Sequence, residues 1–208
     1  MLERIDHLVF ATADLDSGIA CVEELFGVSV VAGGHHPDFG THNALVSLGQ
    51  RTYLEIVAPD PKRTEPSLPE LFRLHQIDQP QLVTWAVRGN GLDNVAANAV
   101  GAGLDLGSVA SGSRLTQEGT LLEWLLTDPY ADRLGGIIPF FIDWLDTPHP
   151  ASSLPRACVL QRLTFLHPDV SLAEAAFTSI GITANVSYGP VPSMLATIET
   201  PTGVVTLT

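Results

Sequence analysis

A histidine among apolar residues is the first group in the chain that could do chemistry. His7 lies in the stretch 5–10 (IDHLVF), which is typical of a short strand. Side chains alternate between the two faces of a strand, so Ile5, His7 and Val9 are expected on one face and the even-numbered residues on the other. A histidine beside two aliphatic side chains is either a hydrogen-bonded core group or a ligand that points into a cavity.

A carboxylate occupies a comparable position in a second strand-like stretch, 53–58 (YLEIVA). Glu55 alternates there with Tyr53 and Val57. An unpaired carboxylate is expensive to bury. The pattern therefore indicates either a solvated strand face or a polar cavity for Glu55.

Polar side chains are densest between residues 35 and 43 (HHPDFGTHN). Residues 35–40 are expected to form a loop, in which Gly40 permits a tight turn, and His42 and Asn43 are expected at the start of the next strand. The stretch is either an ordinary exposed loop or a cover over a binding site that donates hydrogen bonds to a substrate carbonyl. In the second reading His36, His42 and Asn43 contact the substrate.

Aromatic residues and one arginine are further candidates. Trp85, Trp124, Phe141 and Trp144 belong either to sheet packing or to a cavity wall. Arg114 is expected on a strand, either at the surface or paired with a substrate carboxylate.

These residues lie on elements that recur along the chain. The first unit is expected to contain a strand (5–10), a helix (15–26) that begins after Asp14 and ends at Gly27, and three more strands (28–32, 41–48 and 53–58). A proline-rich linker follows at 59–80, with one helical turn around 68–74. The order then restarts with a strand at 83–88, a helix at 92–100 and strands at 104–109, 121–126 and 138–144.

A third unit begins after a second Pro/Ser-rich loop. It has a strand at 159–166, a helix after the capping box of Ser171 and Glu174, and short strands at 183–187, 195–199 and 204–208. The units begin near residues 5, 83 and 160, an almost constant interval that indicates an internal repeat. The predicted organisation is a first βαβββ module (1–60), a linker (61–81), a second βαβββ module (82–147) and a shortened third module (156–208). The fold class is α+β, with curved mixed sheets and helices outside.

The amino-acid composition limits which molecules the protein is expected to bind and where it is expected to be located. The net charge of −13 argues against nucleic acid and anionic membranes, which bind clustered Lys and Arg. The two cysteines, Cys21 and Cys158, have no metal-ligand spacing and fit a reducing compartment. No signal peptide and no apolar run of roughly 18 residues is apparent, so a cytoplasmic location is expected. Hydrophobic sheet edges favour a homodimer.

The repeated βαβββ order resembles the vicinal oxygen chelate superfamily, which includes glyoxalase I, extradiol dioxygenases and bleomycin-binding proteins. The residues that carry the resemblance are DHLVF (6–10), GGHH (33–36), GTHNAL (40–45), YLE (53–55) and PFFIDW (139–144). More narrowly, they are similar to the glyoxalase-like domain proteins. The resemblance covers residues 4–146 and implies a half-open barrel around a metal, whose ligands come from the first and fourth strands of each module.

Carried onto this chain, the resemblance implies His7 and Glu55 as metal ligands from the first module. In the second module, Trp85 falls where a second histidine is expected, and Asp143 falls near the carboxylate position. The implied ligand set is His7, Glu55 and Asp143, with His36 or His42 as further candidates. The implied ion is Zn, Ni, Mn or Fe.

Three functions are open for these residues. The first is a small-molecule enzyme of the glyoxalase/dioxygenase type, in which a metal polarises two vicinal oxygens and Glu55 is the general base of an isomerase or lyase. Its substrate contacts are the following residues: His36, His42, Asn43, Trp85, Arg114 and Phe141. The alternative is a non-catalytic small-molecule binding protein with an incomplete metal site, favoured by Trp85 and the aromatic residues. A cavity filled by Trp85 and Phe141 would instead indicate an assembly or regulatory role.

Overall fold

The computed structural model describes residues 1–62, 71–101, 103–116 and 119–208. The first module comprises β1 (Ile5–Ala11), α1 (Leu15–Phe26), β2 (Val31–His36), β3 (Thr41–Gly49) and β4 (Thr52–Pro59). The second comprises β5 (Gln81–Arg88), α2 (Leu92–Gly101), β6 (Val109–Leu115), β7 (Leu121–Thr127) and β8 (Phe140–Asp143). The expected α+β fold of repeated βαβββ modules is confirmed.

Two strand boundaries differ from the expectation and bear on the site. His35 and His36 belong to β2, so the predicted loop at 35–40 is wrong for these two residues. The strand expected at 104–109 lies instead at Val109–Leu115, where it carries Arg114. A short 3-10 helix, η2, spans Leu71–Gln76; the earlier part of the predicted turn at 68–74 lies outside the described residues.

The two modules form one curved eight-stranded sheet in the order β2-β3-β4-β1-β5-β8-β7-β6. Within each module the first and fourth strands pair in parallel, and β1 and β5 join the modules in an antiparallel pair. The sheet curls until its two edge strands, β2 and β6, lie side by side. The edges are so close that a Cβ on Gly34 would come within 2.8 Å of the Leu115 carbonyl oxygen. The result is a nearly closed barrel.

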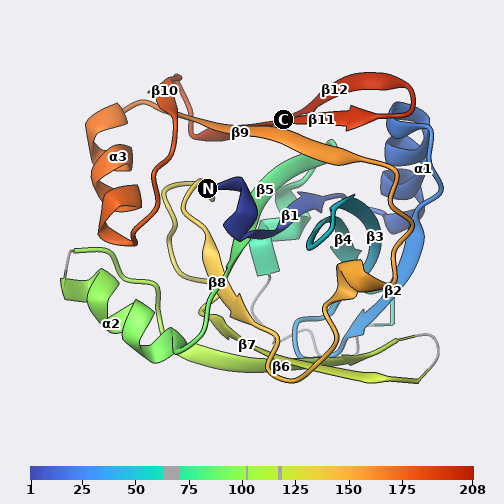
Figure 1. Ribbon diagram of the computed structural model, residues 1–208, viewed down its shortest axis with the longest axis horizontal. Helices are drawn as coiled ribbons and strands as arrows, with labels where there is room; N and C mark the ends of the chain where they lie inside the picture. Colours follow the sequence, from blue (N-terminus) through green and yellow to red (C-terminus); the bar gives the residue numbers. More distant parts are fainter. Residues whose placement is uncertain (63–70, 102, 117–118) are drawn as a thin grey trace.

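The third segment forms a separate sheet that packs on the outside of this barrel (Figure 1). It comprises β9 (Val159–His167), α3 (Val170–Ser179), β10 (Val186–Tyr188), β11 (Ser193–Thr200) and β12 (Gly203–Leu207). The order of elements is again βαβββ, but the strand order is β10-β9-β11-β12, with the first strand in the interior of the sheet. This pairing differs from that of the first two modules, so the segment forms no third half-barrel.

Each face of the barrel sheet has its own apolar cluster, one outside the barrel and one inside it. Outward-facing residues such as Leu8 and Trp85 pack with Phe165 of the second sheet, whereas Val9 and Ala86 face the barrel interior. Within the described residues, no helix is long and apolar enough to cross a membrane.

A β-bulge at Asp6 decides which residues of β1 face inward. Ile5 pairs with Val87 and His7 pairs with the adjacent Ala86, so Asp6 is an extra residue in β1. Strict alternation is therefore wrong for this strand. Ile5 faces the outer cluster, and His7 faces the barrel interior with Val9.

Candidate functional site

The fully buried Asp6 carboxylate fixes the His7 ring. Its Oδ1 lies 2.8 Å from His7 Nδ1, its Oδ2 lies 3.0 Å from His149 Nε2, and both oxygens lie 3.2 Å from the Trp144 indole nitrogen. Burial raises the pKa of Asp6, but the bonds to His149 and His7 lower it by more, and the net pKa is well below the ordinary value. Asp6 is therefore a buried anion held by three donors.

This network assigns the protons of both histidines. The backbone N–H of Ala151 donates to His149 Nδ1 at 3.2 Å, so the proton of a neutral His149 is on Nε2 and is donated to Asp6. His7 likewise donates to Asp6 from Nδ1. The lone pair of a neutral His7 is then on Nε2, which points into the barrel.

Glu55 presents a second acceptor to the same point. Its Oε2 lies 3.7 Å from His7 Nε2, and its Oε1 accepts a hydrogen bond of 2.6 Å from Asn43 Nδ2. The Asn43 amide cannot be turned round, because its Oδ1 accepts a 2.9 Å bond from the Gly34 N–H. Two lone-pair atoms therefore converge at 3.7 Å, an arrangement that binds a proton or a cation.

His36 of β2 is a neutral group at the edge of this site. Burial lowers its pKa to about 4, an effect that Arg114 reinforces and that Glu55 opposes. Its Nδ1 lies 3.1 Å from Thr41 Oγ1, and its Nε2 lies 3.5 Å from Asn43 Nδ2. His36 is therefore uncharged near neutral pH, and both of its ring nitrogens lie next to protein partners.

The cavity around these groups is small, about 50 Å³, enough for one or two water molecules. Tyr53 stacks on His7 with ring centroids 4.7 Å apart, and Phe140 meets His7 edge-on at 5.4 Å. Burial raises the pKa of Tyr53 well above its ordinary value, with Asp6 and Glu55 adding to the effect, so its phenol stays protonated. Further aromatic residues complete the wall: Phe39, Phe72, Trp124 and Trp144.

Arg114 is the cation of the site. Its side chain lines the cavity although the residue is only 6% exposed, and it forms no hydrogen bond or ion pair with any described residue. It also lines a larger groove of about 520 Å³ between β2 and β6, which includes His35, His42 and Asn43. Because its guanidinium group borders the groove and has no partner among the described residues, Arg114 is suited to an anionic ligand that reaches it from the groove.

The barrel interior thus brings together five of the residues singled out in the sequence: His7, His36, Asn43, Glu55 and Arg114. Trp85 is not among them, and the expectation that it takes the place of a second inward-facing histidine is wrong. Because of the bulge, His7 is opposite Ala86, and Trp85 faces outward, where its Nε1 donates to the Ile137 carbonyl at 2.7 Å. Phe141 also packs in the outer core, and its neighbour Phe140 faces the cavity.

Asp143 does not reach His7 and Glu55 either. In β8, Phe140 pairs with Ala86 as Tyr53 pairs with His7 in the first module, so Ile142 takes the place of Glu55. Ala86 and Ile142 have no donor atoms to offer a metal. The implied ligand set of His7, Glu55 and Asp143 is therefore wrong in its third member, and of its three members only His7 and Glu55 converge in the cavity. His42 lies in the groove.

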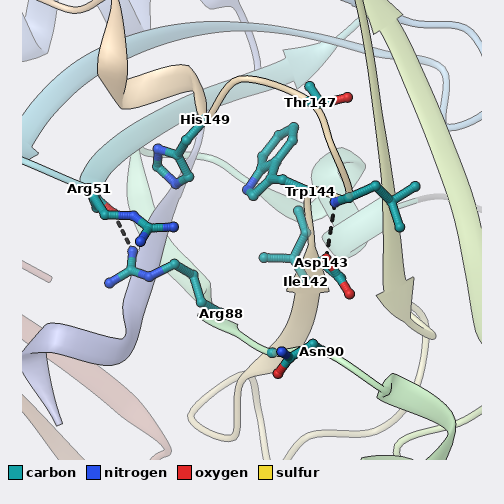
Figure 2. Close-up of a pocket in the computed structure, with 10 residues that line it drawn as sticks. Arg51, Arg88, Asn90, Ile142, Asp143, Trp144, Thr147 and His149 are labelled. Carbon is teal, nitrogen blue, oxygen red and sulfur yellow. Dashed lines mark hydrogen bonds between the residues drawn. The ribbon is translucent and has the colours of Figure 1, made fainter.

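Asp143 lines a different pocket, of about 420 Å³, which Figure 2 shows. Asp143 accepts a hydrogen bond of 3.0 Å from the Leu145 N–H, while Arg88 donates to the carbonyl oxygens of Ile5 and Arg51. Trp144 and His149, which hold Asp6, also line this pocket. It therefore lies behind the network that orients His7.

Two residues of the site, Asp6 and His149, are not indicated by the sequence. Strict alternation places Asp6 on the face opposite His7, and His149 lies 143 positions away from Asp6 in the chain. Trp124 and Trp144, for which both packing and a cavity wall were open, line the cavity. The adjacent Asp-His pair was the one sequence signal that could have indicated an oriented imidazole.

The family model described as "Glyoxalase-like domain" matches residues 5–181. A solved structure of a hypothetical protein from Staphylococcus aureus is 15% identical, with a TM-score of 0.66 over 91% of this chain and 87% of that one. The structure of a methylmalonyl-CoA epimerase from Mycobacterium tuberculosis is 20% identical, with a TM-score of 0.43 over 68% of this chain and 87% of that one. The structure of a methylmalonyl-CoA epimerase from Streptomyces coelicolor is 19% identical, with a TM-score of 0.45 over 72% of this chain and 100% of that one. The staphylococcal structure shares the fold. No curated protein matches the chain.

Proposed function

Because the chain belongs to the glyoxalase-like domain family, we propose that its barrel cavity is the active site of a small-molecule isomerase or lyase. The substrate is a small anion with two vicinal oxygens, such as a 2-oxo or 2-hydroxy carboxylate. The observation that carries the proposal is the convergence of His7 Nε2 and Glu55 Oε2 at 3.7 Å beside Arg114, which no described residue pairs.

Each group has a distinct role in this reaction. Arg114 binds the carboxylate of the substrate and stabilises the negative charge that develops on the neighbouring oxygen. Glu55 Oε2 removes the proton from the carbon next to the carbonyl, and the C–H electrons form an enolate. The protonated Glu55 passes this proton to the lone pair on Nε2 of His7, and His7 returns it to the enolate, which restores both side chains. Asp6 holds the His7 ring in place, and Asn43 holds Glu55.

The family resemblance also implies a divalent ion, which would supply Lewis-acid polarisation of the two oxygens. Of the ligands expected for it, only His7 and Glu55 face each other in the cavity, whereas a resident catalytic metal usually has three protein ligands. The described residues of the cavity do not complete such a site. The reaction is therefore derived from side chains alone.

Binding without catalysis is the second candidate, and the lining of the cavity favours it. At about 50 Å³ the cavity admits a substrate or another ligand only when a wall residue moves, and aromatic side chains make up much of the wall. A protein that sequesters a planar ligand would need these aromatic surfaces and no turnover. Cytoplasmic location and a homodimer stay predictions.

Exchange of substrate hydrogen for deuterium distinguishes the two functions. Purified protein in D2O is incubated with a panel of 2-oxo and 2-hydroxy carboxylates, and loss of the carbon-bound proton signal is followed by NMR. We expect faster exchange with at least one compound, and a loss of roughly 100-fold or more in Glu55→Gln and in His7→Gln. Arg114→Met should mainly raise KM, and Glu199→Gln, exposed on the second sheet, is the matched control.

Tight binding of a panel compound without exchange, unchanged in Glu55→Gln, would support the binding protein instead. If the protein shows no exchange and binds none of the compounds, both functions are rejected for this substrate class.

A further inference from the structure

A second set of ligand atoms lies outside the barrel cavity. One ligand atom from each of His35, His42 and Asp60 lies within 4.8 Å of the other two. Among the His, Cys, Asp and Glu residues that the structure describes, this is the one group of three with such spacing. It lies apart from the His7–Glu55 pair, because none of its members lines the cavity.

Three adjacent strands hold these residues at one level of the sheet. His35 of β2 is directly opposite His42 of β3, and their rings stack with centroids 5.8 Å apart. Asp60 directly follows β4, and its N–H donates to the Gly40 carbonyl at 3.0 Å. The three positions are therefore fixed by sheet pairing and by the β2–β3 turn.

The carboxylate is already aimed at the histidines. Asp60 Oδ1 accepts a hydrogen bond of 2.8 Å from the Lys62 N–H, which leaves Oδ2 to face His35 Nδ1 at 2.5 Å. A charged hydrogen bond between His35 and Asp60 accounts for these two residues alone. It does not account for His42, whose ring brings a second imidazole to the same point.

We propose that His35, His42 and Asp60 bind a divalent transition metal such as Zn2+. Two imidazoles and one carboxylate are a ligand set that suits Zn2+ and Fe2+, and three protein ligands leave at least one coordination position open. The site is partly exposed, so a metal can enter from solvent.

The open position gives the metal a role in ligand binding. His35 and His42 line the 520 Å³ groove between β2 and β6, and Arg114 lines the same groove. A small molecule with an oxygen donor and a carboxylate can therefore contact the metal and Arg114 together. The site would anchor such anions at the entrance to the barrel cavity.

The experiment uses untagged protein that has been treated with EDTA and then dialysed. Zn2+ alone is titrated by calorimetry, and Co2+ binding is followed by visible absorption, which reports coordination number and nitrogen ligation. We expect one equivalent to bind to the wild type. His42→Ala and Asp60→Asn each remove a proposed ligand, so each should weaken Zn2+ binding strongly. The loss should exceed the roughly 10–100-fold that follows removal of a residue that only hydrogen-bonds to a metal ligand.

His7→Ala is the matched control, because it removes a histidine from the barrel cavity and leaves the groove intact. Circular dichroism and urea unfolding establish that each variant is folded. Retained binding in His7→Ala with loss in His42→Ala supports the proposal. Loss in His7→Ala with retention in His42→Ala would move the metal to the cavity and overturn it, and so would absence of binding to the wild type.

Discussion

At the scale of single residues, Asp6 controls the candidate active site. A buried carboxylate is stable only when donors surround it, and here His7, His149 and Trp144 supply them. Two of these donors come from residues 144 and 149, beyond the second module's last barrel strand. The orientation of His7 therefore depends on a segment that follows the barrel strands in the chain.

Asp6→Asn should change how stability depends on pH. Because the pKa of Asp6 in the folded protein is below its ordinary value of 3.8, the unfolded chain takes up a proton below that pH and the folded chain does not. This contribution is present above pH 3.8 and decreases as the pH falls further. We expect the free energy of unfolding to fall more steeply in the wild type than in Asp6→Asn between about pH 4 and pH 3.

The measurement is urea unfolding at several pH values, with the variant less stable at neutral pH by about 3 kcal/mol because buried donors lose their anion. Parallel pH profiles for the two proteins would show that Asp6 is not the buried anion described here.

At the scale of elements, neighbouring strands set the shape of the cavity wall. Gly112 of β6 pairs with Trp124 of β7, and a Cβ at Gly112 would lie 2.5 Å from atoms of the indole ring. Because Gly112 has no side chain, the Trp124 ring can lie against β6 beside the cavity. Glycine is needed at this position for space and not for an unusual backbone conformation.

Gly112→Ala should displace Trp124 and destabilise the protein by about 1–3 kcal/mol, the usual cost of overpacking. Tryptophan fluorescence and urea unfolding report the two effects. Gly101→Ala is the matched control, since a Cβ there meets nothing within 4 Å. Equal stability of the two variants would show that the indole does not rest on Gly112.

At the scale of the whole molecule, the second sheet stabilises the barrel from outside. Trp85 lies between the two sheets, with its ring 5.4 Å from Phe165 and 6.4 Å from Phe177. Helices α1 and α2 cover other parts of the barrel (Figure 1), and the concave side is left to the cavity and its aromatic wall. The packing between the two sheets and the proposed ligand site thereby lie on opposite faces of the barrel sheet.

Trp85→Ala should therefore lower stability by about 3–5 kcal/mol, as loss of a large buried side chain does, and leave ligand affinity unchanged in the folded fraction. Phe140→Ala, in the cavity wall, should change affinity as well. Unfolding curves and binding isotherms below the melting temperature check both. A specific loss of affinity in Trp85→Ala would return this residue to the binding site.

The sequence by itself determined the order of elements, the repeat and the family, because hydrophobic periodicity and turn residues act locally. It also indicated His7, His36, Asn43, Glu55 and Arg114, which the barrel brings together.

Only the tertiary structure decided the partners of these residues. One extra residue at Asp6 shifts the pairing of β1 with β5, so that Ala86 and Ile142 occupy the places expected for Trp85 and Asp143. A bulge inverts the faces of a strand without changing its composition. The bond between Asp6 and His149 and the meeting of His35, His42 and Asp60 likewise depend on distant segments that only the folded chain brings into contact.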